Sequence, residues 1–177
     1  MSRLEGSERR RLIPKDEVVA FLGLTRKDLL LDLGAGIGYF SIPASKRAGS
    51  VIALDMEPKM LEVFANRIAK NRLANIELVR GDIGALPMTH ASAGHILAAF
   101  VYHEVPSPKK FMRECARVLS SGDHLTIVDF QKRETPIGPP VEERKTPREV
   151  LRTASEEFEI ESRRETDVYY ALKLRKR

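Results

Sequence analysis

Apolar residues along this chain alternate between short continuous runs and stripes with helical spacing. The runs, bounded by glycine or polar residues, predict buried strands at residues 28–33, 50–54, 75–79, 94–100 and 123–130. The stripes predict helices at residues 16–22, 37–46, 58–71 and 108–119. A last helix should begin at Thr146, because Thr146 and Glu149 have the spacing of a capping box. Two consecutive strands, 158–163 and 168–174, should follow it.

This alternation predicts an α/β fold. We expect a Rossmann-like, doubly wound and mostly parallel seven-stranded sheet with helices on both faces. The consecutive final strands predict one antiparallel strand near the C-terminal edge. Ligands of such sheets bind beyond the carboxyl ends of the strands, so the residues just after each strand are the candidate site. We expect one domain over residues 1–177, with a basic segment at 1–14 and a proline-rich active-site loop at 131–145.

The composition is that of a globular chain. Hydrophobic residues make up 42% and charged residues 31% of the 177 residues, which argues against both disorder and a membrane protein. No apolar run approaches the roughly 20 residues that span a bilayer, and the polar start of the chain predicts no signal peptide. Cys115 is the only cysteine, so we expect no disulfide, no metal site and a cytoplasmic location.

The formal net charge of +5 comes largely from the two ends of the chain. Such ends attract polyanions, so a nucleic-acid partner is possible. We favour solvated tails, because no aromatic residues are interleaved with these charges. The basic residues are Arg9, Arg10, Arg11, Lys173, Arg175, Lys176 and Arg177.

Three glycines lie between the first predicted strand and the next helix. Gly34, Gly36 and Gly38 suit a turn where a ligand lies against the main chain, which favours a ligand loop over an ordinary glycine-rich turn. The spacing G-x-G-x-G differs from the G-x-G-x-x-G of dinucleotide loops, and no phosphate-binding P-loop motif is present. Asp32 at the loop entrance would repel a phosphate. It could instead receive an ammonium group, directly or through water.

The segment from Asp32 to Gly38, which includes Ala35, resembles the first motif of class I S-adenosylmethionine-dependent methyltransferases. The resemblance implies that the loop backbone wraps the methionine part of the cofactor, with Tyr39 beside it. The resemblance covers about residues 10–174. The segment at 129–144, most distinctively Gly138-Pro139-Pro140 with Glu143-Arg144, resembles small type 11, arsenite-methyltransferase-like proteins. Arsenite methyltransferases use several cysteines to hold arsenic, so a single cysteine makes arsenic methylation doubtful.

Asp55 ends the second predicted strand. An ionised carboxylate has two acceptor oxygens and can accept both hydroxyls of a ribose. The alternative is a cap for the helix that starts at Pro58. The preceding glycine loop favours ribose binding, although NAD enzymes use the same device.

The resemblance implies further cofactor contacts. Asp82 should accept a hydrogen bond from the adenine amino group, with Ile83 packed on the ring and Met56 packed against it from the second strand. Asp82 has a turn-stabilising role as its alternative, and Met56 has core filling. Ala98 and Phe100, at the end of the fourth strand, complete the expected cofactor set.

The loop after the fourth strand should lie at the reaction centre. It lacks the Asn-Pro-Pro-Tyr type of motif, which argues against methylation of amino groups on adenine, cytosine or glutamine. His103 is the candidate general base for a hydroxyl or thiol acceptor, with a structural histidine as an equal alternative. Glu104 is its candidate catalytic neighbour, or only a helix cap. Tyr39 and Tyr102 should line the acceptor pocket or fill the core.

Arg144 lies in the proline-rich loop after the fifth strand. Prolines fix the course of that loop. The guanidinium is a candidate contact for an anionic acceptor, and a solvated charged linker is the alternative.

These features together predict a methyltransferase that passes a methyl group from S-adenosylmethionine to a small molecule by in-line displacement. Alignment of donor and acceptor supplies roughly 7–11 kcal/mol of such a barrier, so an obvious catalytic triad is not required. The alternatives are an RNA methyltransferase that uses the basic termini, a NAD-dependent oxidoreductase, and a cofactor-binding sensor without turnover. Asp32 and the glycine spacing disfavour the oxidoreductase. The acceptor atom and the oligomeric state do not follow from these motifs.

Overall fold

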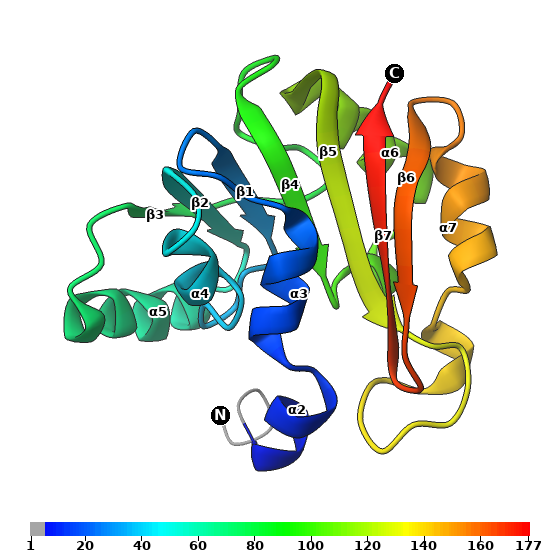
Figure 1. Ribbon diagram of the computed structural model, residues 1–177, viewed down its shortest axis with the longest axis horizontal. Coiled ribbons are helices and arrows are strands. Elements are labelled where there is room, and N and C mark those ends of the chain that lie inside the picture. Colours follow the sequence, from blue (N-terminus) through cyan, green and yellow to red (C-terminus); the bar gives the residue numbers. More distant parts are fainter. Residues whose placement is uncertain (1–5) are drawn as a thin grey trace.

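A seven-stranded sheet runs through the molecule in the order β3-β2-β1-β4-β5-β7-β6 (Figure 1). The computed structural model describes residues 6–177. The strands are β1 Leu29–Leu33, β2 Ser50–Asp55, β3 Ile76–Arg80, β4 Ala93–Ala99, β5 Leu119–Phe130, β6 Phe158–Glu165 and β7 Tyr169–Lys176. β1 to β5 are parallel, and β7 is antiparallel to both β5 and β6. The predicted fold class, including the single antiparallel strand near the C-terminal edge, is confirmed.

Helices cover both faces of the sheet. On one face lie α3 Lys15–Leu22, α4 Ser41–Ser45 and α5 Pro58–Asn71, and on the other α6 Pro108–Val118 and α7 Pro147–Ala154. Successive strand residues point to opposite faces. Leu97 of β4 therefore packs in the core beneath α3, while its neighbour Ile96 packs in the core beneath α6.

Two helix starts follow directly from local chemistry. α7 begins with the predicted capping box, in which the Thr146 hydroxyl accepts from the Glu149 N–H and the Glu149 carboxylate accepts from the Thr146 N–H. α5 begins at Pro58, where the missing N–H of proline costs no helical hydrogen bond. The amphipathic stripe of α6 is buried as expected, including Cys115.

The helix expected at residues 37–46 is shorter than predicted, because α4 begins only at Ser41. Gly38 has φ +80°, a left-handed value that cannot belong to a right-handed helix. A Cβ at Gly38 would lie 2.2 Å from a ring carbon of Phe64. This residue therefore serves a tight turn and close packing against α5, and it delays the helix.

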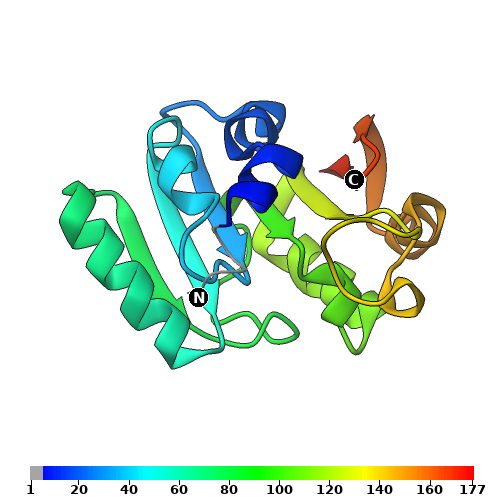
Figure 2. The same ribbon diagram turned by 90° about the horizontal axis from the view of Figure 1, so that it is seen from below.

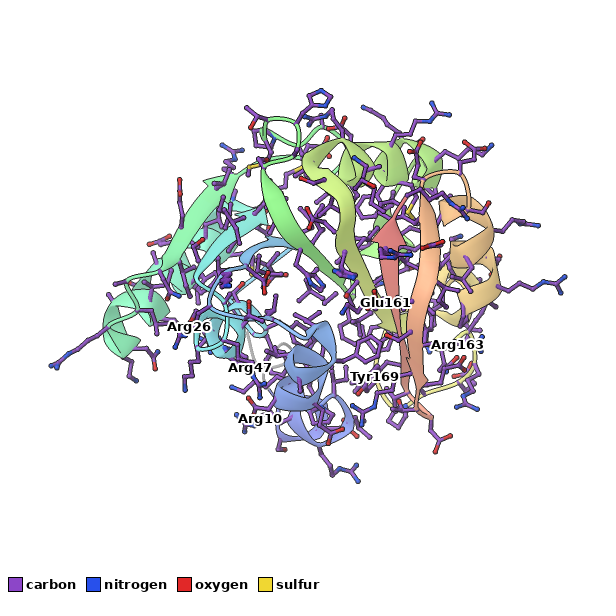
Figure 3. All side chains as sticks on the ribbon, turned by 45° about the horizontal axis from the view of Figure 1, so that its top comes forward. Arg10, Arg26, Arg47, Glu161, Arg163 and Tyr169 are labelled. Carbon is purple, nitrogen blue, oxygen red and sulfur yellow. The ribbon has the colours of Figure 1, made fainter. Side chains whose placement is uncertain are left out.

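The basic residues near both ends, except Arg177, belong to regular elements and not to tails, although Arg10, Arg11 and Arg175 are exposed to solvent as expected. Lys173 lies in β7 with its Nζ 2.9 Å from a carboxylate oxygen of Glu161 on β6, and Arg175 pairs with Glu159. Glu161 is labelled in Figure 3. At the other end, residues Ser7–Leu12 form a short helix, α2, which lies at the carboxyl ends of the parallel strands (Figure 1). Every helix within residues 6–177 is too short or too polar to cross a membrane.

We expect Thr146→Ala to lower the free energy of unfolding by about 1 kcal/mol, because one helix N–H loses its acceptor. Urea denaturation measures this loss. Ser155→Ala is the matched control at the other end of α7, since the Ser155 hydroxyl only returns to the Arg152 carbonyl of its own helix. A control change of less than about 0.5 kcal/mol is expected, and equal losses in both variants would contradict the capping role.

Candidate functional site

A cavity of about 700 Å³ opens at the carboxyl ends of the parallel strands. Its floor is the glycine loop at residues 34–37 together with the ends of β4 and β5. Its roof is formed by α2 and by residues 136–139 of the loop after β5. Figure 2 looks onto this end of the sheet, with α2 and the yellow loop lying across it. The rule that placed the candidate site beyond the strand ends therefore leads to a real cavity.

Gly36 lies at the centre of the glycine loop and lines the cavity. It has φ +54°, and a Cβ built there would meet no atom within 4 Å. The backbone therefore faces open space, which is the geometry that a ligand lying on the main chain requires. Gly34 and Ala35 line the same wall.

Asp55 closes the glycine loop onto β2. Its Oδ2 accepts a hydrogen bond from the Gly36 N–H at 2.7 Å, and its Oδ1 accepts from the Glu57 N–H at 2.9 Å. The cap of α5 is Glu57, whose carboxylate accepts from the Lys59 N–H, so Asp55 is not the cap residue of this helix. Each carboxylate oxygen has a second lone pair for a ribose hydroxyl.

Asp32 is buried beneath the loop, with 2% of its surface exposed. The pKa of Asp32 is raised from 3.8 to about 7, mainly by burial and to a smaller extent by the charge of Asp55, while the hydrogen bond from the Ser41 hydroxyl acts in the opposite direction. The side chain does not line the cavity. Asp32 is therefore placed to support the loop from below, and a direct contact with an ammonium group is not available in this conformation.

The three residues expected around the adenine ring differ in their exposure and contacts. Met56 is 68% exposed, so core filling is excluded for it. Asp82 is exposed, and its Oδ1 accepts from the Gly84 N–H at 2.7 Å, which is the turn-stabilising interaction named as its alternative. Ile83 is half-buried against the core.

The end of β4 shows a correction of one position. Ala98 is fully buried within the sheet, whereas Ala99 lines the cavity. Phe100 follows with φ +59°, a strained value for a residue with a side chain. This conformation brings the Phe100 ring into the cavity wall, 4.6 Å from the ring centre of Phe130 and 6.1 Å from that of Phe40.

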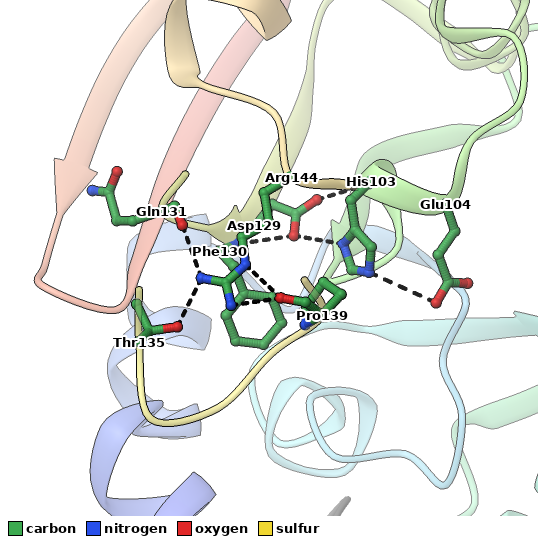
Figure 4. A network of polar contacts seen from close by, with 8 residues as sticks. All are labelled: His103, Glu104, Asp129, Phe130, Gln131, Thr135, Pro139 and Arg144. Atoms are coloured by element: carbon green, nitrogen blue, oxygen red, sulfur yellow. Dashed lines mark hydrogen bonds and ion pairs between the residues drawn. The ribbon is translucent and has the colours of Figure 1, made fainter. Parts of the chain in front are cut away.

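His103 and Asp129 form a hydrogen-bonded pair at the cavity (Figure 4). The Nδ1 atom of His103 lies 2.8 Å from Oδ1 of Asp129. The backbone N–H groups of His103 and Phe130 also donate to this buried carboxylate. Because the carboxylate accepts all of these bonds, we assign the proton to Nδ1, which leaves Nε2 as the free base.

The environment of His103 favours its protonated form. Burial lowers the pKa of His103, but the hydrogen bond that His103 donates to Asp129 and the negative charges of Asp129, Glu104 and Glu143 outweigh it, so the net shift is upward. Asp129 was not among the predicted site residues. It stands at the carboxyl end of β5, so the rule that selected Asp55 could have found it.

The other three residues predicted for the reaction centre face solvent, the core and the cavity, respectively. The Glu104 side chain is 71% exposed, with Oε1 3.7 Å from Nε2 of His103. Tyr102 is buried and packs edge-on against Phe111, which is the core-filling alternative. Tyr39 lines the cavity, and its hydroxyl donates to the Ile13 carbonyl at 2.9 Å.

Arg144 is neither a free anion contact nor a solvated linker, so both expectations are corrected. The residue is 3% exposed. Its guanidinium donates to the carbonyls of Pro139, Gln131 and Arg133 and to the Thr135 hydroxyl (Figure 4). Its donors are therefore used in fastening the loop whose residues 136–139 roof the cavity. Within residues 6–177 no group of three or more His, Cys, Asp or Glu side chains could hold a metal ion.

Comparison with known proteins identifies the family. A methyltransferase domain of type 11 matches residues 31–127, which is more than half of the chain. The arsenite methyltransferase of Halobacterium salinarum is 31% identical over 113 residues, covering 62% of this chain and 29% of that protein. The ubiquinone/menaquinone biosynthesis C-methyltransferase of Sinorhizobium fredii is 31% identical over 129 residues, covering 70% of this chain and 50% of that protein. The chain thus spans half or less of the length of these two relatives.

Comparison with solved structures leads to the same family. A SAM-dependent methyltransferase from Aquifex aeolicus has a TM-score of 0.89 and 26% identity, covering 98% of this chain and 95% of that chain. The PH0226 protein of Pyrococcus horikoshii shares the fold, with a TM-score of 0.80 at 18% identity, covering 98% of this chain and 93% of that chain. The chain belongs to the type 11 family of S-adenosylmethionine-dependent methyltransferases, which confirms the resemblance found in the glycine loop.

We expect Asp32→Asn to change how stability depends on pH. An acid whose folded pKa is raised contributes stability that is present below its unfolded pKa and lost as pH rises through the folded value. Wild type should therefore lose free energy of unfolding between pH 4 and pH 8, whereas Asp32→Asn has no such titrating group. The difference in free energy of unfolding between the variant and wild type should rise by on the order of a few kcal/mol over this range. Urea unfolding at several pH values measures the difference between the two proteins.

Ser41→Ala provides a second variant for this test. Removing the Ser41 hydrogen bond takes away an interaction that lowers the pKa of Asp32. The loss of stability should then extend to higher pH than in wild type. A difference between wild type and Asp32→Asn that is constant from pH 4 to pH 8 would contradict the account of Asp32.

Proposed function

We propose that this protein transfers a methyl group from S-adenosylmethionine to a hydroxyl or thiol of a small-molecule acceptor. The observation that carries the proposal is the His103–Asp129 pair facing the same cavity as the glycine loop. A volume of about 700 Å³ suits small ligands rather than a macromolecule. The names of the relatives, arsenite and menaquinone methyltransferases, also favour small acceptors.

The cofactor would be held by the glycine loop, which lines the cavity, together with Asp55 and Met56 at the end of β2 beside it. The open space above Gly36 would take the methionine part, Asp55 would accept the ribose hydroxyls, and Met56 would cover the adenine. A pyrophosphate would have no basic side chain on the glycine loop to meet it. When bound, S-adenosylmethionine supplies a methyl group that its sulfonium makes electrophilic.

His103 would act on the acceptor. Asp129 holds the ring with Nδ1–H turned inward, so Nε2 can take the proton from an acceptor hydroxyl or thiol as that atom bonds to the methyl group. Phe100 and Phe130 provide an apolar wall for the acceptor. Arg144 is a positioning residue, because it fixes the loop above them.

The nucleic-acid alternative is less favoured. Lys173 and Arg175 are paired with acidic residues of β6, and Lys176 donates to the Leu119 carbonyl at 2.7 Å. These charges are therefore partly neutralised within the sheet rather than free to release counterions from RNA. We propose a cytoplasmic location, in agreement with the single buried cysteine.

We expect Asp129→Asn to lower kcat by roughly 10²–10⁴-fold, because an amide does not hold His103 in the same tautomer. The rate should fall as pH drops through the raised pKa of His103, since only the neutral ring is a base. In Asp129→Asn this acid limb should move to lower pH. Methyl transfer to an acceptor found in a metabolite screen measures both effects.

Glu134→Gln is the control for this series, because Glu134 is an exposed carboxylate of the loop after β5 that is not part of the cavity lining. It should retain activity within a few-fold. Binding of S-adenosylhomocysteine should be unchanged in both variants. Unaltered turnover in Asp129→Asn would rule out His103 as the base.

We expect Asp55→Ala to weaken S-adenosylhomocysteine binding by a few kcal/mol at most, the order of two lost charge-assisted hydrogen bonds. Isothermal titration calorimetry measures this, with NAD as the competing ligand and Asp16→Ala on α3 as the exposed control. The control should bind like wild type. Wild-type affinity in Asp55→Ala would remove Asp55 from the cofactor site, and preferential NAD binding would overturn the cofactor assignment.

A further inference from the structure

Arg9 of α2 lies in the roof of the cavity, where the basic start of the chain would not be expected. Its guanidinium carbon is 5.2 Å from the ring centre of Tyr39 and 5.3 Å from that of Phe100. These two aromatic side chains come from different segments, since Tyr39 follows the glycine loop and Phe100 follows β4. The guanidinium therefore contacts both the segment expected to hold the cofactor and the segment expected to face the acceptor.

The Arg9 side chain donates no hydrogen bond to residues 6–177. Its Nε is buried and has no hydrogen-bond partner there. No carboxylate among these residues forms an ion pair with it, although Glu8 and Glu104 also line the cavity. Both of those glutamates are exposed, so water screens their charges. Arg144, which is fully buried at the edge of this site, has carbonyl or hydroxyl partners for all three of its nitrogens, whereas Arg9 is half-buried.

Cation–π contacts stabilise the charge of a guanidinium but satisfy none of its N–H groups. A buried and unsatisfied donor is costly, and arginine is always charged in proteins. Burial also lowers the pKa of Arg9 from its ordinary value, which is a further sign that the charge is poorly solvated. The guanidinium edge, with its fixed fork of donors, matches the two oxygens of a carboxylate.

We propose that Arg9 binds the carboxylate of a ligand in the cavity. The inference rests on the proposed function, and it deepens it by adding an anion-binding position. The carboxylate can belong to the methionine part of the cofactor, since Arg9 adjoins the glycine loop through Tyr39. It can equally belong to the acceptor, since Arg9 also contacts Phe100. In either case α2 is part of the binding site and not a solvated tail.

The first arm of the test uses the cofactor product. S-adenosylhomocysteine and its decarboxylated analogue, which lacks only the carboxylate, are titrated calorimetrically into wild type, Arg9→Met and Arg10→Met. Arg10 is the matched control, being exposed on the same helix (Figure 3). If the carboxylate is that of the cofactor, Arg9→Met should weaken S-adenosylhomocysteine binding by roughly 10–100-fold and leave binding of the analogue unchanged. Arg10→Met should resemble wild type with both ligands.

The second arm addresses the acceptor. Benzoate and its neutral isostere benzamide are titrated into the protein with and without S-adenosylhomocysteine, because the cavity wall is aromatic. If the carboxylate is that of the acceptor, wild type should prefer benzoate, and Arg9→Met should lose the preference while keeping its affinity for S-adenosylhomocysteine. Arg9→Lys, which keeps the charge but not the fork, should be intermediate and also replaces Arg9→Met if that variant is unfolded.

The proposal is overturned if Arg9→Met, or Arg9→Lys in its place, binds S-adenosylhomocysteine as wild type does and shows the same benzoate-to-benzamide ratio as wild type. Failure of the proposed function looks different. In that case wild type itself does not bind S-adenosylhomocysteine, while the benzoate preference and its dependence on Arg9 are still measurable.

Discussion

The buried carboxylate of Asp129 is the interaction on which the site depends most. It is the penultimate residue of β5 and accepts hydrogen bonds from the His103 ring, the His103 backbone and the Phe130 backbone. One side chain thereby ties the loop after β4 to the end of β5. A buried carboxylate is tolerated only when donors surround it. The same requirement that stabilises the fold here also sets the tautomer and orientation of the candidate base.

The two walls of the cavity are held by different means. On the cofactor side, Asp55 accepts from the Gly36 N–H and holds the glycine loop against β2. On the acceptor side, Arg144 donates hydrogen bonds to carbonyls of the loop after β5. Phe100 has a positive φ, and in this conformation its ring faces the cavity. The cavity surface between these two walls is formed mainly by glycine backbone and aromatic rings, with Arg9, His103 and Glu104 as polar side chains among them. Such a surface can align donor and acceptor while His103 takes the proton.

The sequence was sufficient for the features that depend on local pattern. The strand runs, the capping box at Thr146 and the glycine loop each carry their own signal within a few residues, and the structure bears them out. The start of α4 was misplaced because hydrophobic spacing does not reveal that Gly38 adopts a left-handed conformation. The prediction of Ala98 misses the cavity residue Ala99 by one position. Which residues at a strand end face a cavity depends on the three-dimensional packing around that end.

Charged residues were the hardest to interpret from sequence. Arg9 and Arg144 are both surrounded by polar neighbours along the chain, which is typical of solvated segments. The position of Arg9 depends on a contact with Phe100, which is distant in sequence. The position of Arg144 depends on hydrogen bonds to Gln131 and Arg133 at the opposite end of its own loop. Asp129 was missed for a different reason. Its role depends on the hydrogen bond with His103, which lies 26 positions earlier in the chain, and no sequence spacing predicts that contact.

The most direct test of the central claim is a crystal structure of the protein with S-adenosylhomocysteine. The account predicts the amino-acid part over the backbone of residues 34–36, the ribose hydroxyls on Asp55, and the sulfur directed toward the space in front of His103. A cavity that stays empty at saturating ligand, or a nucleotide bound there with its pyrophosphate on the glycine loop, would contradict it.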